Sequence, residues 1–138
     1  MSPTRELWTA IVARLKADTA LMALVDAVYD KADPAQWTGA KFANITRGPN
    51  YGVDESADCI PGVEITQQID VWTRDTRRSA CDDVVYAVRR ALHDAELTLT
   101  DSALVSLTVT LWRVVDDPNP STQHGIVQVV ALVEEPVT

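Results

Sequence analysis

Histidine and cysteine, the side chains that most often perform chemistry in proteins, are few in this sequence and lie apart. His93 ends a predicted helix and His124 opens a predicted strand, and neither belongs to a known motif. Cys59 and Cys81 lie 22 positions apart, with no CxxC spacing and no histidine at metal-ligand spacing. We therefore expect one thiol in a polar loop, one in the core, and structural roles for both histidines.

The adjacent acidic residues do not form a site either. Asp82 and Asp83 are neighbours on a predicted helix, where they point about 100° apart and indicate a solvated face. Asp116 and Asp117 lie in a turn beside Pro118, where aspartate accepts backbone hydrogen bonds. The sequence has no GxSxG, HExxH, GxxxxGKS or GxGxxG motif. We expect no catalytic, cofactor-binding or metal site, and hence a protein that is not an enzyme.

The polar segment from Gly48 to Pro61 is predicted to be a long loop. Its acids Asp54, Glu55 and Asp58 lack the spacing and the fixed glycine of a calcium-binding EF-hand, so they do not predict a cation site. Loops of this length are often functional. Together with Tyr51, these acids are predicted to contact a neighbouring subunit.

Length and charge narrow the possible functions. The chain has 138 residues and a mass of 15.1 kDa, which fits a single domain over residues 1–138. Twelve Lys and Arg against twenty Asp and Glu give a net charge of −8, and no basic patch forms. Stable nucleic-acid binding, which needs clustered cations, is therefore disfavoured. No apolar run reaches the roughly 20 residues that cross a bilayer, so we expect no membrane contact.

The first third of the chain predicts two helices and one strand. Ser2 and Pro3 begin the first helix, and Asp18 caps a short second one. Residues 27–39 are predicted to be a connection, and residues 41–47 a strand. The apolar residues at helical spacing in the first helix are Trp8, Ile11, Val12 and Leu15.

The second half predicts three strands and a helix. Residues 63–72 alternate between apolar and polar, as do residues 105–112, and residues 125–133 form a last apolar strand. Between the first two of these strands lies a helix with Asp75 or Thr76 as its cap. The apolar stripe of this helix is Cys81, Val84, Val85, Val88 and Leu92.

The predicted order is ααββαββ, which favours an α+β fold: an antiparallel-rich sheet of about four strands with helices packed on one face. Trp72 and Trp112 fall on strand positions opposite the aliphatic residues, so both indoles are expected on the sheet face away from the helices. A face that mixes Trp with Thr and Gln is typical of a protein interface. The alternative is that a loop covers these tryptophans.

Four segments that cover most of the chain carry a resemblance to a known family. They are LWTAIVARLKADTALMALVDAVYD, EITQQIDVWTRD, SACDDVVYAVRRALHDAELTL and SLTVTLWRVVDDPNPSTQHGIVQVVALVEE. In element order and apolar pattern they resemble the small phage tail-completion proteins, which are tail terminators or head–tail joining proteins. The family offers no residue motif that would carry a functional site onto this sequence.

The resemblance implies structural work in a virion. It implies a hexameric ring that caps the finished tail tube and joins it to the head connector. DNA passes through the lumen of this ring as cargo. The implied partners are further copies of the chain, the tail-tube protein and the head–tail connector protein, with no cofactor. The implied location is the head–tail junction of the virion, after synthesis in the host cytoplasm.

Further expectations follow from this resemblance. The excess of acidic over basic residues fits a channel for DNA, because negatively charged walls repel phosphates. Subunit contacts are expected at strand edges, at the predicted loop and at the turn 116–123. Two alternatives stay open: another head–tail adaptor or tail-tube ring protein, and a small cytosolic α+β ligand-binding module.

Overall fold

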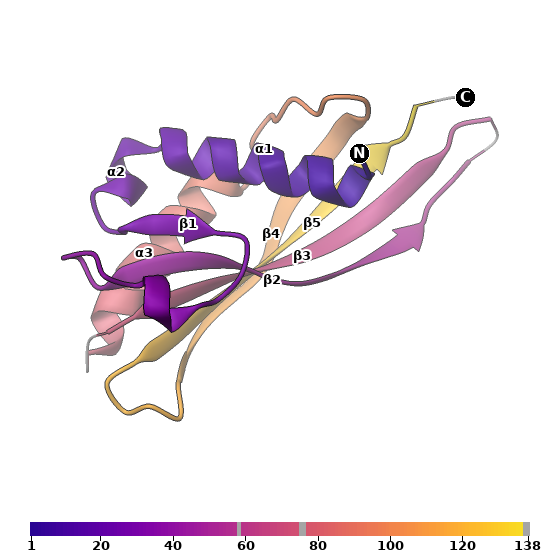
Figure 1. Cartoon of the computed structure of the whole chain (residues 1–138). Coiled ribbons are helices and arrows are strands. Elements are labelled where there is room, and N and C mark those ends of the chain that lie inside the picture. The colour runs from indigo at the N-terminus through magenta and orange to yellow at the C-terminus, as the bar shows by residue number, and fades with distance from the viewer. Residues whose placement is uncertain (58, 75–76, 137–138) are drawn as a thin grey trace.

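The computed structural model describes residues 1–57, 59–74 and 77–136 (Figure 1). Its elements, in chain order, are α1 Pro3–Ala17, α2 Thr19–Met22, β1 Ala27–Tyr29, the 3-10 helix η1 Pro34–Gln36, β2 Ala43–Asp54, β3 Gly62–Thr73, α3 Arg78–Leu92, β4 Ala103–Asp116 and β5 Gln123–Glu134. The fold is mixed α+β, as predicted. The sheet has five strands instead of about four, and β1 adds one element to the predicted order.

The two N-terminal helices begin at the predicted capping residues. The Ser2 hydroxyl accepts a hydrogen bond from the Arg5 backbone N–H at 3.2 Å. The Asp18 carboxylate accepts one from the Leu21 N–H at 2.9 Å and starts α2. Both side chains satisfy N–H groups that have no partner within the helix.

The third helix, α3, begins at Arg78 with Arg77 at its N-cap. The predicted caps Asp75 and Thr76 lie outside the described residues. The predicted apolar stripe is confirmed, because every member of it is buried against the rest of the fold. The buried side chains of α3 are Cys81, Val84, Val85, Val88, Ala91 and Leu92.

The strands form one sheet in the order β1-β2-β3-β5-β4. All neighbours in it are antiparallel except β1, which runs parallel to β2. α1 and α3 cover the same face of the sheet (Figure 1), and the Arg14 side chain of α1 donates a hydrogen bond to the Ala91 carbonyl of α3 at 2.9 Å. Residues 27–39, predicted to be a plain connection, contain β1 and η1.

The largest difference from the prediction lies in residues 48–61. β2 was expected to end at Arg47, but it continues to Asp54 after an irregularity between Arg47 and Asn50, and β3 begins at Gly62. This part of β2 is exposed on both faces, so no apolar alternation marks it in the sequence. Pro49 is compatible with it because proline, which lacks an N–H, is tolerated at a sheet edge.

A β-bulge in β4 overturns the prediction for the tryptophans. The register places one extra residue, Thr110, between Val109 and Leu111. A one-residue bulge moves the side chains that follow it to the other face of the sheet. Trp112 therefore lies on the face that α3 covers, and Trp72 lies on the opposite face. The expectation that both indoles share one face is wrong.

Close packing of α3 on the sheet depends on Gly125 in β5. A Cβ atom at this position would lie 2.5 Å from Val85 Cγ2, 3.0 Å from Cys81 Sγ and 3.1 Å from Val71 Cβ. No side chain fits there without movement of the helix, because real Cβ contacts do not reach 2.5 Å. Gly125 therefore sets how near α3 approaches the sheet.

Candidate assembly interface

The distal part of the β2–β3 hairpin forms an exposed arm, which comprises residues 50–57 and 59–61. On one side its strand pairs with β3, whereas on the other side β1 pairs only with Asn44, Ile45 and Thr46. Among the described strands, the outer edge of β2 is therefore unpaired along the arm. Its large apolar side chains Tyr51, Val53 and Ile60 are exposed. Unpaired strand edges of this kind tend to pair with another chain.

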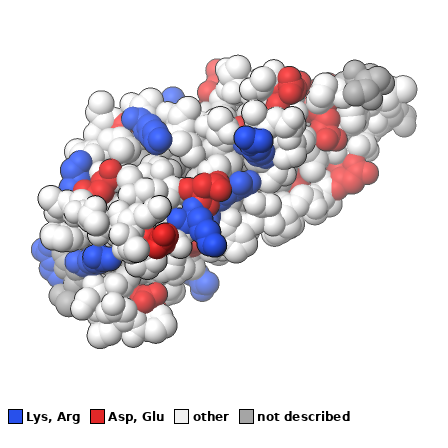
Figure 2. Space-filling view, in the orientation of Figure 1, with Lys and Arg blue, Asp and Glu red and all other residues white. Residues whose placement is uncertain are grey.

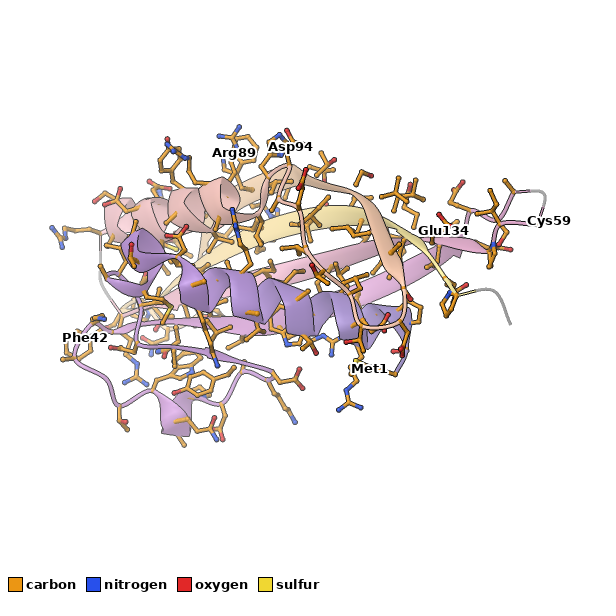
Figure 3. The ribbon with its side chains drawn as sticks, turned by 90° about the horizontal axis from the view of Figure 1, so that it is seen from above. Met1, Phe42, Cys59, Arg89, Asp94 and Glu134 are labelled. Carbon is orange, nitrogen blue, oxygen red and sulfur yellow. The ribbon has the colours of Figure 1, made fainter. Side chains whose placement is uncertain are left out.

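The arm is acidic. Glu55 is exposed, and the Asp54 carboxylate accepts hydrogen bonds from the Ser56 hydroxyl at 2.6 Å and the Ser56 N–H at 3.0 Å. These two bonds hold the pKa of Asp54 below its ordinary value. Asp58 lies outside the described residues. On the face shown in Figure 2, this end of the molecule carries acidic side chains and no Lys or Arg, and Figure 3 shows Cys59 at its tip.

Asp116, the last residue of β4, and Asp117, in the turn that follows, already have partners. The Arg78 guanidinium donates to the Asp116 carboxylate at 2.6 Å, which lowers the pKa of Asp116. Asp117 accepts a hydrogen bond from the Asn119 N–H at 2.9 Å, which stabilises the turn. The strand register places this turn and the arm at opposite ends of the sheet. The predicted interface residues therefore do not form one cluster.

Trp72 lies under a loop, as the alternative interpretation had it. Trp37, from the segment between β1 and β2, is 8% exposed and lies 5.7 Å from Trp72 between ring centroids. His124 stacks on Trp72 at 3.9 Å, and the indole N–H donates to the Thr46 hydroxyl at 2.9 Å. Trp72 is thus held by three neighbours and presents only part of its surface.

A polar pair lies beside this aromatic stack. His124 Nε2 and Asp70 Oδ1 are 2.7 Å apart, and the Gln68 amide donates to the same carboxylate oxygen at 2.9 Å. Both members of the pair are largely buried, so the hydrogen bond satisfies groups that would otherwise lose water without compensation. Within the described residues, no three His, Cys, Asp or Glu side chains lie close enough together to hold a metal ion.

The two thiols differ as predicted. Cys81 is buried, and desolvation raises its pKa to about 11. Cys59 is exposed at the arm tip in a left-handed backbone conformation, with φ 61°. In the part of the chain that the structure describes, no helix has the length and apolar character that a membrane span requires.

The outer edge of β4 is half covered. The Val109 N–H donates to His93 Nδ1 at 3.2 Å, and the Asp94 N–H donates to the Leu107 carbonyl at 3.1 Å. His93 therefore has a structural role at the sheet edge. No described residue pairs with the edge beyond the bulge at Thr110.

An arginine and a tryptophan meet beside this open edge. The Arg89 guanidinium carbon lies 4.0 Å from the ring centroid of Trp112, which is 48% exposed. Arg89 Nε is buried without a hydrogen-bond partner, and Arg89 forms no ion pair among the described residues. We call Arg89 and Trp112 the Arg–Trp patch. An arginine in the last turns of a helix is ordinarily explained by the helix dipole, so no sequence pattern marks this contact.

Comparison with known proteins links the chain to tail assembly. A family model described as tail completion protein gp17 matches residues 9–134. The structure is similar to a chain in the virion of a native gene transfer agent (GTA) particle, with a TM-score of 0.83 and 27% identity over 93% of this chain and 94% of that one. No curated protein matches the chain.

A second solved structure shares the fold. The gp17 protein of bacteriophage SPP1 matches with a TM-score of 0.58 and 23% identity, over 93% of this chain and 88% of that chain. At this identity the likeness concerns the fold alone.

Proposed function

The chain belongs to the tail completion protein gp17 family, and from this premise we propose that it is a structural protein of a phage or prophage-derived virion. We propose that it is a tail terminator. Six copies would form a ring that caps the finished tail tube and joins it to the head connector. Its partners are then further copies of itself, the tail-tube protein and the connector protein.

The family match over residues 9–134 carries this proposal. The likeness to a chain of a GTA virion, which covers nearly the whole of both chains, supports a location in the particle. The exposed surfaces support assembly, because the arm presents an unpaired strand edge and exposed apolar side chains.

A ring needs a heterologous contact, in which one surface of each subunit meets a different surface of the next. The sheet offers two different surfaces, because the edge of β2 along the arm and the edge of β4 lie on opposite sides of it. We propose that the arm, with Tyr51, Asp54, Glu55 and Asp58, contributes to the subunit contacts. The turn with Asp116 and Asp117 lies at the other end of the sheet and is proposed to contact a neighbouring ring.

The net charge of −8 suits a channel through which DNA moves. Negative walls repel phosphates, so DNA in transit is not retained. The charge thus supports DNA as cargo, as opposed to DNA as a bound ligand.

The test is a measurement of mass by light scattering over a concentration series, followed by incubation with tail tubes of the particle that encodes the chain. We expect a closed oligomer, or a monomer that adds to one end of the tubes and stops their growth. A protein that stays monomeric and does not bind to tubes at any concentration would refute the proposal. Binding to the isolated connector without binding to tubes would instead favour a head–tail adaptor.

A further inference from the structure

We propose that the acidic arm of one copy docks on the Arg–Trp patch of the next copy. This contact rests on the ring proposed above and specifies which two surfaces meet in it. Four observations support it: an arginine without a carboxylate partner, an arm without cations, exposed apolar side chains on both surfaces, and two open strand edges.

The cation of the patch is Arg89. The Arg78 and Arg47 guanidinium groups have acidic partners within the chain, Asp116 at 2.6 Å and Asp30 at 3.5 Å. Arg89 has no such partner among the described residues, although its Nε is buried. The Arg89 guanidinium carbon lies 4.0 Å from the Trp112 ring centroid, and this cation–π contact holds the group beside the open edge before any partner arrives. A carboxylate from another molecule would complete this site.

The arm supplies such carboxylates. Its sequence, from residue 50 to residue 61, contains three acids and no Lys or Arg. Tyr51, Val53 and Ile60 are exposed on it, and the Trp112 indole is half exposed on the patch. The two surfaces therefore match in charge and in apolar character. Complementary charge on this scale fixes which surfaces meet and in which orientation.

The strand order excludes the chain's own arm as the partner of the patch, so a contact between arm and patch joins two copies. The order β1-β2-β3-β5-β4 places β3 and β5 between the edge of β2 and the edge of β4, so the arm does not reach its own patch. The β4 edge is covered by His93 and Asp94 up to Val109 and is open beyond Thr110. Docking of the next copy's arm would cover this open part, and the same contact repeated from copy to copy generates a ring.

A charge exchange tests the contact. Glu55→Lys and Arg89→Glu should each raise at least tenfold the protein concentration at which the oligomer forms, and the double variant should restore it, because its charges are complementary again. Arg90→Glu is the matched control, since Arg90 is exposed one position along α3 and contacts Tyr86 of its own helix. An oligomer that persists in both single variants, or a folded double variant that does not recover, would overturn the inference.

Cross-linking provides a test that leaves the charges unchanged. In a Thr110→Cys variant, mild oxidation should join Cys59 of one copy to the new cysteine of the next and give a ladder of covalent oligomers on a denaturing gel. Cys81 is buried and does not take part. The ladder should vanish when Cys59→Ser is added and should be absent for the control Thr19→Cys.

Both tests are made on the state that carries the oligomer, in solution or on tube ends. If an oligomer forms but the ladder of cross-linked species does not, this docking contact is refuted while the proposal of a ring is not. The absence of any oligomer in either state refutes the ring, and the docking contact with it.

Discussion

Replacement of Gly125 by alanine tests how closely α3 packs on the sheet. The added Cβ would lie 2.5 Å from Val85 Cγ2 and 3.0 Å from Cys81 Sγ. Neither neighbour is the flexible end of a long side chain, because valine has a single preferred rotamer in a helix and Cys81 is fully buried. The clash must therefore be relieved by movement of α3 away from β5.

Overpacking of this kind costs roughly 1–3 kcal/mol. Unfolding entropy is about 2.1 cal/mol/K per residue, so each kcal/mol lowers the melting temperature of a 138-residue chain by roughly 3–4 °C. Gly125→Ala should thus lower the melting temperature by roughly 3–10 °C. A matched control is Gly52→Ala, which lies on the exposed arm, where the nearest side-chain atom would be 3.3 Å from the new Cβ. It should change the melting temperature little.

Thermal unfolding followed by circular dichroism measures both variants, and a double-mutant cycle with Val85→Ala identifies the cause. Val85→Ala removes the methyl group that the new Cβ meets, so the Gly125→Ala substitution should cost less in that background. If Gly125→Ala is as stable as the wild type, or if the two effects simply add, then α3 does not pack against β5 as closely as described here.

Three further predictions concern single groups. At pH 8 a thiol reagent should label Cys59 within minutes and leave Cys81 unreacted until the protein unfolds, because burial raises the Cys81 pKa to about 11; equal labelling would contradict this. The pKa of Asp116 is held below its ordinary 3.8 by Arg78, so this pair stabilises the fold above that value and the contribution disappears as the pH falls through the lowered pKa. The stability difference between wild type and Arg78→Ala, measured by urea unfolding, should therefore be larger at pH 6 than at pH 2, and a difference independent of pH would refute the pairing. Phe42 is exposed with φ 57°, so Phe42→Gly should be about 1 kcal/mol more stable than Phe42→Ala in the same assay, and an equal stability would contradict the left-handed conformation.

The elements with one buried face were predictable from the sequence. The stripe from Cys81 to Leu92 and the alternation over residues 63–72 both reflect burial against a core, which imposes its period on the sequence. The caps Ser2 and Asp18 were also predictable, because they act within four residues of themselves.

Features that depend on exposure or on a single inserted residue were not predictable. The strand along the arm has no buried face, so nothing in its composition separates it from a loop. The bulge at Thr110 reverses the orientation of Trp112 without changing the alternation of the sequence before it. Arg89 and Trp112 lie 23 positions apart, and only the packing of α3 on β4 brings them together.

The sheet order has a consequence for how the chain folds during synthesis. β5 is the last strand to be translated, yet it lies between β3 and β4 and hydrogen-bonds to both. Until residue 134 has left the ribosome, the inner edge of β3 has no partner and α3 lacks one of the strands on which it packs. The pairing of β5 with β3 joins residues far apart in sequence, which slows folding and prolongs the exposure of the unpaired edge of β3. Premature association of nascent chains through this edge competes with correct folding.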